Sequence, residues 1–297
     1  MAKIAVDLEH ALARRKEGGT PGQTSPRVVA SGDGWTVADV VCTCGPQDRP
    51  YEEQHVRDAI AIVQAGSFEY RSPAGRAVLT AGSLMLGSHG HSFECAHRHV
   101  EGDRCVSFWY DADYFERLAA DAGARGADRR FKVPSVPALR PLSSLVARAG
   151  LGVCRDADMP WEELAVLLAV RTVTLASGLS SPQSGMPLNA EARMSRAIHI
   201  IDRRSDGSLA LGRLAREAGL SPFHFLRTFK SLVGVTPHQY VLRARLREAA
   251  SRLADGGARV LDVALDCGFG DVSNFNRAFR AEFGESPLAW RKHTRPQ

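Results

Sequence analysis

The C-terminal region of this 297-residue chain repeats itself, and no other feature of the sequence constrains the fold as strongly. Around residue 215 the offset between matching residues is 49, since Ala215 and Gly219 match Ala264 and Gly268. Farther along it is 50, so the second copy has one extra residue in its turn. Six residues match at that larger offset: Phe225, Arg227, Phe229, Gly234, Pro237 and Tyr240 correspond to Phe275, Arg277, Phe279, Gly284, Pro287 and Trp290. A helical solenoid is the alternative, but solenoids usually need three or more stacked copies.

The first copy has the anatomy of a helix-turn-helix. The short helix LGRLAREA is followed by Gly219, which tolerates the left-handed conformation that ends many helices. Ser221 and Pro222 are favoured at the start of the next helix, and Gly234 ends it. Three apolar side chains at helical spacing should form the buried stripe of this second helix: Phe225, Phe229 and Leu232.

The second copy repeats this arrangement. VLDVALDC supplies its first helix, Gly268 the turn, and either Asp271 or Ser273 the cap of the next helix, which Gly284 ends. Its buried stripe is expected to consist of Phe275, Phe279 and Phe283. A long helix from about Pro237 to Leu253 should join the two units.

The face opposite each phenylalanine stripe carries side chains that suit DNA. Arginine can bind guanine through two hydrogen bonds, asparagine can bind adenine in the same way, and apolar groups can contact the thymine methyl. These side chains are Phe223, His224, Arg227 and Lys230 in the first copy and Val272, Ser273, Asn276, Arg277 and Arg280 in the second. The sequence therefore predicts that double-stranded DNA is a partner.

The distribution of charge agrees with this prediction. Residues 191–297 contain 18 Arg and Lys against 11 Asp and Glu, whereas residues 1–190 contain 20 against 22. A basic region attached to a slightly acidic body is typical of a nucleic-acid binder that has a separate second function. A solvated basic face would give the same balance.

The segment GFGDVSNFNRAFRAEFGESPLAWRK and its first-copy counterpart LSPFHFLRTFKSLVGVTPHQYV resemble the signature of the AraC/XylS family of transcription regulators. The resemblance extends from about Met194 to His293, and Trp290 stands where the family more often has tyrosine. It implies a sequence-specific regulator, more often an activator that works with RNA polymerase. Its two recognition helices are expected in successive major grooves, about 34 Å apart.

The resemblance also assigns roles to individual positions. The family's base-reading places fall on Phe223, Leu226, Arg227, Val272, Ser273, Asn276 and Arg277. Leu226 is apolar, so hydrogen-bonded specificity in the first helix is expected to depend on Arg227. Four basic residues are expected to contact phosphates, which position a protein without reading sequence: Lys230, Arg243, Arg245 and Arg280.

The rest of the chain divides into segments, giving an α+β multidomain protein. Residues 1–26 end in GGTPGQTSP and are expected to be a flexible arm. Short β-type runs such as TVADVV and RCVSFWY within residues 27–115 are typical of a sandwich or barrel. Helical segments fill residues 116–180, residues 181–190 form a linker by composition, and residues 191–297 form the DNA-binding domain.

The resemblance implies that residues 27–115 are a cupin-like β-barrel that binds an effector, such as a small molecule, and that residues 116–180 mediate dimerisation. The helix at 161–176 has an apolar face that suits pairing with its twin in a homodimer. Packing against the N-terminal domain of its own chain would hide the same face.

Histidines and cysteines cluster in the segment HGHSFECAHRHVEGDRC. Residues i and i+2 of a strand face the same side, so His97 and His99 are expected to converge. Imidazole and thiolate suit zinc, copper or iron, and the candidate transition-metal ligands are His97, His99, Cys95 and Cys105. The glycine expected six positions before the paired histidines of enzymatic cupins is absent. The alternative to a metal site is that these residues are ordinary core cysteines and surface histidines. If the cluster does bind a metal or react through its thiols, the protein would be a metal- or thiol-responsive regulator or a cupin-type metalloenzyme.

Other classes find little support. The sequence has no apolar run of the roughly 18 residues that span a membrane, and its start does not resemble a secretory signal, so a cytoplasmic location is expected. Structural disulfides are then unexpected for the six cysteines. No Ser-His-Asp set, phosphate loop or dinucleotide fingerprint is present, and no cysteine resembles that of a DNA-repair methyl acceptor. We expect a protein that is not an enzyme.

Overall fold

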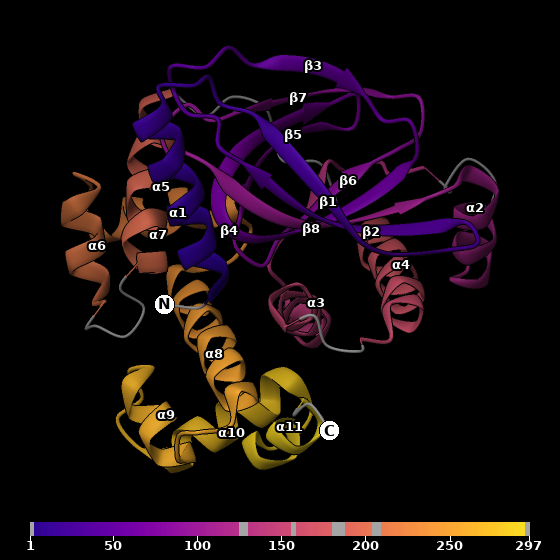
Figure 1. Cartoon of the computed structure of the whole chain (residues 1–297). Coiled ribbons are helices and arrows are strands. Elements are labelled where there is room, and N and C mark those ends of the chain that lie inside the picture. The colour runs from indigo at the N-terminus through magenta and orange to yellow at the C-terminus, as the bar shows by residue number, and fades with distance from the viewer. Residues whose placement is uncertain (1–2, 125–129, 156–158, 180–187, 204–208, 295–297) are drawn as a thin grey trace.

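The computed structural model describes residues 3–124, 130–155, 159–179, 188–203 and 209–294. Figure 1 shows an antiparallel β-sheet domain formed by the N-terminal half, with helices around it, and a group of helices formed by the C-terminal part. Among the described residues, no helix is both long and apolar enough to span a bilayer.

The sheet contains nine strands in the part of the chain that is described. They are β1 (Thr24–Gly32), β2 (Trp35–Cys42), β3 (Tyr51–Gln54), β4 (Asp58–Ser72), β5 (Gly75–Thr80), β6 (Leu84–Gly87), β7 (Ser92–Ala96), β8 (Asp103–Tyr110) and β9 (Ser135–Val136). The pairing runs in the order β1-β2-β8-β4-β6-β9, with β5 and β7 also paired to β4 and β3 paired to β7. This path has two ends, so the described strands form an open antiparallel sheet and do not close into the barrel that the sequence suggested.

The long strand β4 belongs to both layers of this domain. Its first half pairs with β6 and β8, while its second half pairs with β5 and β7. The register with β8 shifts between Val63 and Ala65, where a bulge lets the strand bend. Along β4, Ile60 and Ile62 face one side and Ala61 and Val63 the other, as the twofold period of a strand requires.

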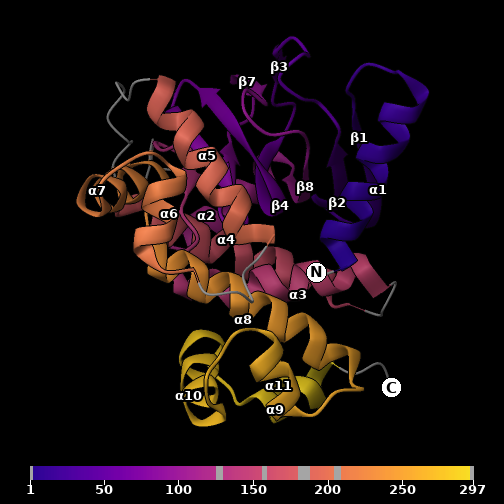
Figure 2. The same cartoon turned by 90° about the vertical axis from the view of Figure 1, so that its left-hand side faces the viewer.

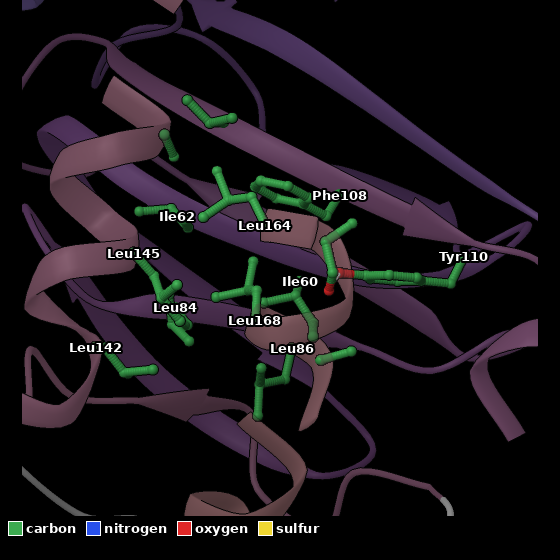
Figure 3. Close-up of a cluster of buried hydrophobic side chains, with 14 of the residues drawn as sticks. Ile60, Ile62, Leu84, Leu86, Phe108, Tyr110, Leu142, Leu145, Leu164 and Leu168 are labelled. Carbon is green, nitrogen blue, oxygen red and sulfur yellow. Dashed lines mark hydrogen bonds between the residues drawn. The ribbon is translucent and has the colours of Figure 1, made fainter. Parts of the chain in front are cut away.

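Two helices cover the outer face of the sheet, α3 (Ser143–Arg155) and α4 (Trp161–Ser177). In Figure 3, Leu164 and Leu168 of α4 pack against Ile60, Ile62 and Phe108 of the strands. All five side chains are completely buried, and burying each one contributes about 1.5–3 kcal/mol to the stability of the fold. The apolar face of α4 is therefore covered by its own domain, as one of the two sequence alternatives held. Two shorter elements accompany these helices, α2 (Ala112–Asp121) and η2 (Arg140–Leu142).

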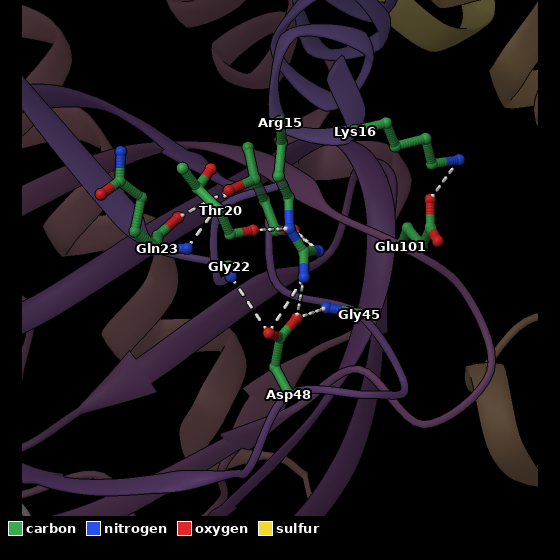
Figure 4. A network of polar contacts seen from close by, with 9 residues as sticks. Arg15, Lys16, Thr20, Gly22, Gln23, Gly45, Asp48 and Glu101 are labelled. Carbon is green, nitrogen blue, oxygen red and sulfur yellow. Dashed lines mark hydrogen bonds and ion pairs between the residues drawn. The ribbon is translucent and has the colours of Figure 1, made fainter. Parts of the chain in front are cut away.

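The N-terminal residues form helix α1 (Lys3–Gly18), so the prediction of a flexible arm over residues 1–26 is wrong. Leu8 is buried in the same core as the strands. Arg15 donates to Asp48 with an Nη2–Oδ2 distance of 2.7 Å, and Lys16 pairs with Glu101 (Figure 4). The Gly- and Pro-containing stretch that suggested an arm occupies only the short connection from α1 to β1 and the start of that strand.

The C-terminal helices are α5 (Leu188–Arg203), α6 (Leu211–Glu217), α7 (Pro222–Val233), α8 (Pro237–Asp255), α9 (Val260–Asp266), α10 (Val272–Phe283) and α11 (Pro287–Thr294). Figures 1 and 2 both show α8 leading from the helices around α7 to the group formed by α9, α10 and α11. Of the predicted linker at 181–190, residues 181–187 lie outside the described residues, and helix α5 begins at Leu188.

Each copy of the sequence repeat has its own core. Phe225, Phe229 and Tyr240 are completely buried in the first, and Phe275 and Phe279 are completely buried in the second. The prediction that the phenylalanines belong to the core is confirmed. The long connecting helix is also present, as α8.

Candidate nucleic-acid interface

The first candidate recognition helix, α7, starts and ends where the sequence predicts. Ser221 caps it by accepting a hydrogen bond from the backbone N–H of His224, and Pro222 takes the first helical position. Gly234 ends it with a φ of 79°, a conformation that side-chain-bearing residues adopt reluctantly. Phe225 and Phe229 bind this helix to its core, so its orientation leaves the other face in solvent.

That outer face of α7 carries the predicted residues. Phe223 is 69% exposed and Leu226 is 38% exposed. Arg227 and Lys230 are exposed beside them. Within the described residues, neither basic side chain has a hydrogen bond or ion pair to the protein, so both are available to a ligand.

The second candidate recognition helix, α10, has the same design. Of the two caps considered, Asp271 is the one used: its Oδ1 accepts from the backbone N–H of Asn274 at 2.7 Å. Phe275 and Phe279 point into the core. The opposite face leaves Val272 half-buried and exposes Ser273, Asn276, Arg277 and Arg280.

Helix α8 joins the two units and contacts helices of both. Its 19 residues give it a length of about 28 Å at 1.5 Å per residue. Thr236 and Gln239 form a capping box at its start. At its other end, Trp290 of α11 donates from Nε1 to the carbonyl of Ala250 at 3.0 Å. The aromatic residue that departs from the resembled family's tyrosine is thus a core wedge with a satisfied N–H.

Two of the predicted phosphate contacts do not lie on these faces. The prediction that Arg243 contacts phosphate is wrong. Its side chain is only 11% exposed, with Nε 3.1 Å from Glu282 and Nη1 2.7 Å from the carbonyl of Ala138. A guanidinium occupied in this way is not open to phosphates. Arg245 is half-buried and donates to the carbonyl of Gly268 in the second turn. Lys230 and Arg280 are exposed. The phosphate contacts of Lys230, Arg280 and Arg245 remain predictions.

The N-terminal domain contains a cavity of about 620 Å³ between the two layers of its sheet. Its walls include Phe68, Phe93 and Trp109 together with polar groups from several strands. His55, on this wall, stacks on Phe93 with ring centroids 4.1 Å apart, and its Nε2 lies 2.8 Å from Tyr70 Oη. Tyr70 donates to the carbonyl of Leu86, so His55 is the donor in that contact. Burial lowers the pKa of His55 to about 4, which keeps it neutral.

The predicted convergence of His97 and His99 is wrong. Strand β7 ends at Ala96, so the alternation of a strand does not extend to these residues. His97 is buried and its Nε2 lies 2.7 Å from Asp103 Oδ1. His99 is exposed and lies instead near Glu69 and Glu191.

The buried histidine is grouped with two residues outside the predicted ligand set, and a predicted ligand, Cys105, lies beside them. Its neighbours are Asp103 and Cys42, and Cys105 donates from Sγ to Asp103 Oδ2 at 3.2 Å. Cys95 lines the same cavity. Burial raises the pKa of the Cys42 and Cys105 thiols, with Asp103 adding to the effect. The spacing of Asp103 and Cys105 is a signal that sequence reasoning missed, since two residues at i and i+2 of a strand share a face.

Comparison with known proteins locates the similarity mainly in the C-terminal region. A family model described as a helix-turn-helix domain matches residues 214–293. The probable transcriptional regulator LumQ of Photobacterium leiognathi is 38% identical over 90 residues, which are 30% of this chain and 36% of LumQ. The probable transcription factor PqrA of Proteus vulgaris is 34% identical over 91 residues, which are 31% of this chain and 74% of PqrA.

The DNA-binding domain of AdpA, in a crystal structure with a target DNA, is 28% identical with a TM-score of 0.33, covering 34% of this chain and 91% of that one. The chain spans about a third of the length of the first relatives it matches, LumQ and the regulator Rv1931c of Mycobacterium tuberculosis.

Proposed function

Because this chain belongs to the AraC/XylS family of transcription regulators, we propose that it regulates transcription by placing α7 and α10 in successive major grooves of DNA. One observation carries the proposal: both helices bury a phenylalanine stripe and expose an opposite face with basic side chains, joined by apolar ones on α7 and by an amide on α10. Helix α8 joins the two units, so both belong to one continuous helical region of the chain.

The residues of the two faces suit different parts of the DNA. Arg227 and Arg277 would bind guanine, and Asn276 would bind adenine, each through two hydrogen bonds. Lys230 and Arg280, one turn farther along each helix, would contact phosphates. Apolar contacts with thymine methyl groups would come from Phe223, Leu226 and Val272, with Ser273 as a further base-reading residue.

We propose that the N-terminal domain, a cupin-like regulatory domain, controls how the second unit meets DNA. Leu151 of α3 belongs to the same buried cluster as Phe275 and Phe279. Glu282, on the inner side of α10, accepts a hydrogen bond from Ser143 of α3. An effector in the cavity of the sheet domain would change the free energy of these contacts and thereby the DNA affinity.

The remaining roles follow from the family. We propose that the protein is an activator that works in the cytoplasm with RNA polymerase and binds as a homodimer. The apolar face of α4 is buried within the chain, so a dimer would use another surface. Sedimentation of the full chain at micromolar concentration tests this, and a mass that stays monomeric on operator DNA would contradict it.

The test of the function is a selection of bound sequences from random double-stranded DNA by the full chain. We expect enrichment of two half-sites about one helical turn apart. Affinity for an enriched site is then compared for the native chain, Arg277→Ala, and Arg117→Ala, in which an exposed arginine of α2 is removed from the other domain. A selection that enriches no sequence, or equal losses in both variants, would refute the proposed function.

A further inference from the structure

Four metal-ligating side chains meet on the wall of the sheet-domain cavity. Single ligand atoms of Cys42, His97 and Asp103 all lie within 4.8 Å of one another. The sulfur of Cys105 is 3.2 Å from Asp103 Oδ2. Each of the four residues is at most 6% exposed, yet all of them line the cavity, so an ion could reach them from inside.

Strand register brings these groups together and holds them on rigid elements. Cys42 of β2 is the direct cross-strand partner of Asp103 of β8. Cys105 follows two residues later on β8 and therefore shares the face of Asp103. His97 enters from the end of β7. Three of the four ligands thus come from two paired strands, the kind of support that fixes ligand geometry.

We propose that this cluster binds one transition-metal ion of the zinc type, held by Cys42, His97 and Asp103, with Cys105 at the fourth position. Ligand atoms around tetrahedral zinc are about 3.3–3.8 Å apart, so the cluster would need only small side-chain movements. A donor set of thiolate, imidazole and carboxylate favours zinc, cobalt or copper over magnesium or calcium, which prefer oxygen alone.

His97 is next in sequence to a residue whose ion pairs connect the cluster to the DNA-binding half of the chain. The neighbouring Arg98 donates from Nε to Glu69 Oε2 at 3.0 Å. The same oxygen accepts from Arg76 at 2.8 Å, and Arg76 also donates to Glu191 of α5 at 2.8 Å. An ion bound by His97 would therefore fix the backbone beside Arg98, and with it the network of Arg98, Glu69, Arg76 and Glu191. The inference names the ligand that the sheet domain senses, and for its effect on DNA it rests on the proposed function.

The experiment uses the full chain without a histidine tag, stripped by chelator under reducing conditions and titrated with Co²⁺. We expect one cobalt per chain, a sulfur-to-cobalt charge-transfer band in the near ultraviolet, and intense visible absorption typical of a tetrahedral site. Cys42→Ser and His97→Gln should each lower the affinity by at least about 10-fold, because loss of even indirect support costs that much.

Matched controls come from the same chain. Cys154→Ser removes a thiol of α3 outside the cluster, and His99→Gln removes the exposed histidine two residues from the buried one. Both should keep the native spectrum. Circular dichroism establishes that each variant is folded, and Asp103→Asn provides a third cluster variant that keeps the size of the side chain.

Absence of the sulfur-to-cobalt band in the folded native chain would overturn the metal site and mark the cluster as a hydrogen-bonded network. Equal binding by Cys42→Ser and the native chain would overturn it as well. Zn²⁺ loading should also change affinity for the selected DNA in the native chain and not in His97→Gln. Metal binding with unchanged DNA affinity would overturn the sensing role, whereas metal binding without any DNA binding would instead defeat the proposed function.

Discussion

Arg243 of α8 and Glu282 of α10 form a buried ion pair, with Nε 3.1 Å from Oε1 and side chains only 11% and 8% exposed. The same carboxylate accepts from Ser143 of the N-terminal half, and the same guanidinium donates to the carbonyl of Ala138. The connecting helix α8, helix α10 and the N-terminal half of the chain therefore meet at one charge pair.

Removing one member of this pair should destabilise the protein. Arg243→Ala leaves the Glu282 carboxylate buried without its cation, and such losses cost about 3–5 kcal/mol. Urea unfolding of the full chain measures the free energy of unfolding. Arg280→Ala, on the exposed face of α10, is the control and should change that free energy by less than about 0.5 kcal/mol. Similar values for the two variants would mean that the ion pair contributes little.

Arg277→Ala should relax sequence discrimination at one base position. A guanidinium that binds a base through two hydrogen bonds contributes about 1–3 kcal/mol of preference for that base. The measurement compares affinities for a selected site and for its three single-base variants at each position. A uniform loss across all versions would assign Arg277 to the backbone and not to a base.

Lys230→Ala should weaken binding to every sequence to the same extent. A lysine that neutralises one phosphate releases about one counterion, so the slope of log K against log salt should fall in magnitude by about 0.9. Arg243→Ala is expected to leave that slope unchanged, because its side chain is buried in the protein. A lower slope for Arg243→Ala would show that the arginine leaves its pair with Glu282 when DNA binds.

The helical half of the fold was largely predictable because its signals are local. Gly234 and Gly284 end their helices with φ values near +80°, and Ser221 and Asp271 each cap the helix that follows through a backbone N–H three positions farther along. The exposed faces of α7 and α10 follow from helical period alone once the phenylalanines are assigned to the core.

The errors involve partners that are distant in the sequence. Arg243 was expected in solvent, but Glu282 lies 39 residues away and sequence period does not reveal it. Helix α1 was taken for an arm because its anchor, Asp48, lies 33 residues from Arg15. The grouping of Cys42 with Asp103 depends on the register of β2 and β8, which a list of strand-like runs does not specify.

The final prediction concerns Asp202 of α5, whose Oδ1 accepts from Tyr240 Oη at 3.0 Å. Burial raises the pKa of Asp202 to about 6, against the opposing effects of Arg247 and the Tyr240 hydrogen bond. The folded chain thus holds this proton more tightly than the unfolded chain, in which the pKa is about 3.9. Its contribution to stability is complete below about pH 4 and is lost as the pH rises through 6.

Asp202→Asn removes this titration and keeps an acceptor for Tyr240. Relative to the native chain, the variant should therefore gain stability between pH 4 and pH 7, on the order of 2 kcal/mol. His55, whose pKa is lowered to about 4, acts in the opposite direction over the same range but equally in both proteins, so it cancels in the difference. Urea unfolding at intervals of one pH unit measures that difference, and parallel stability curves would show that the Asp202 carboxyl titrates alike in the folded and unfolded chains.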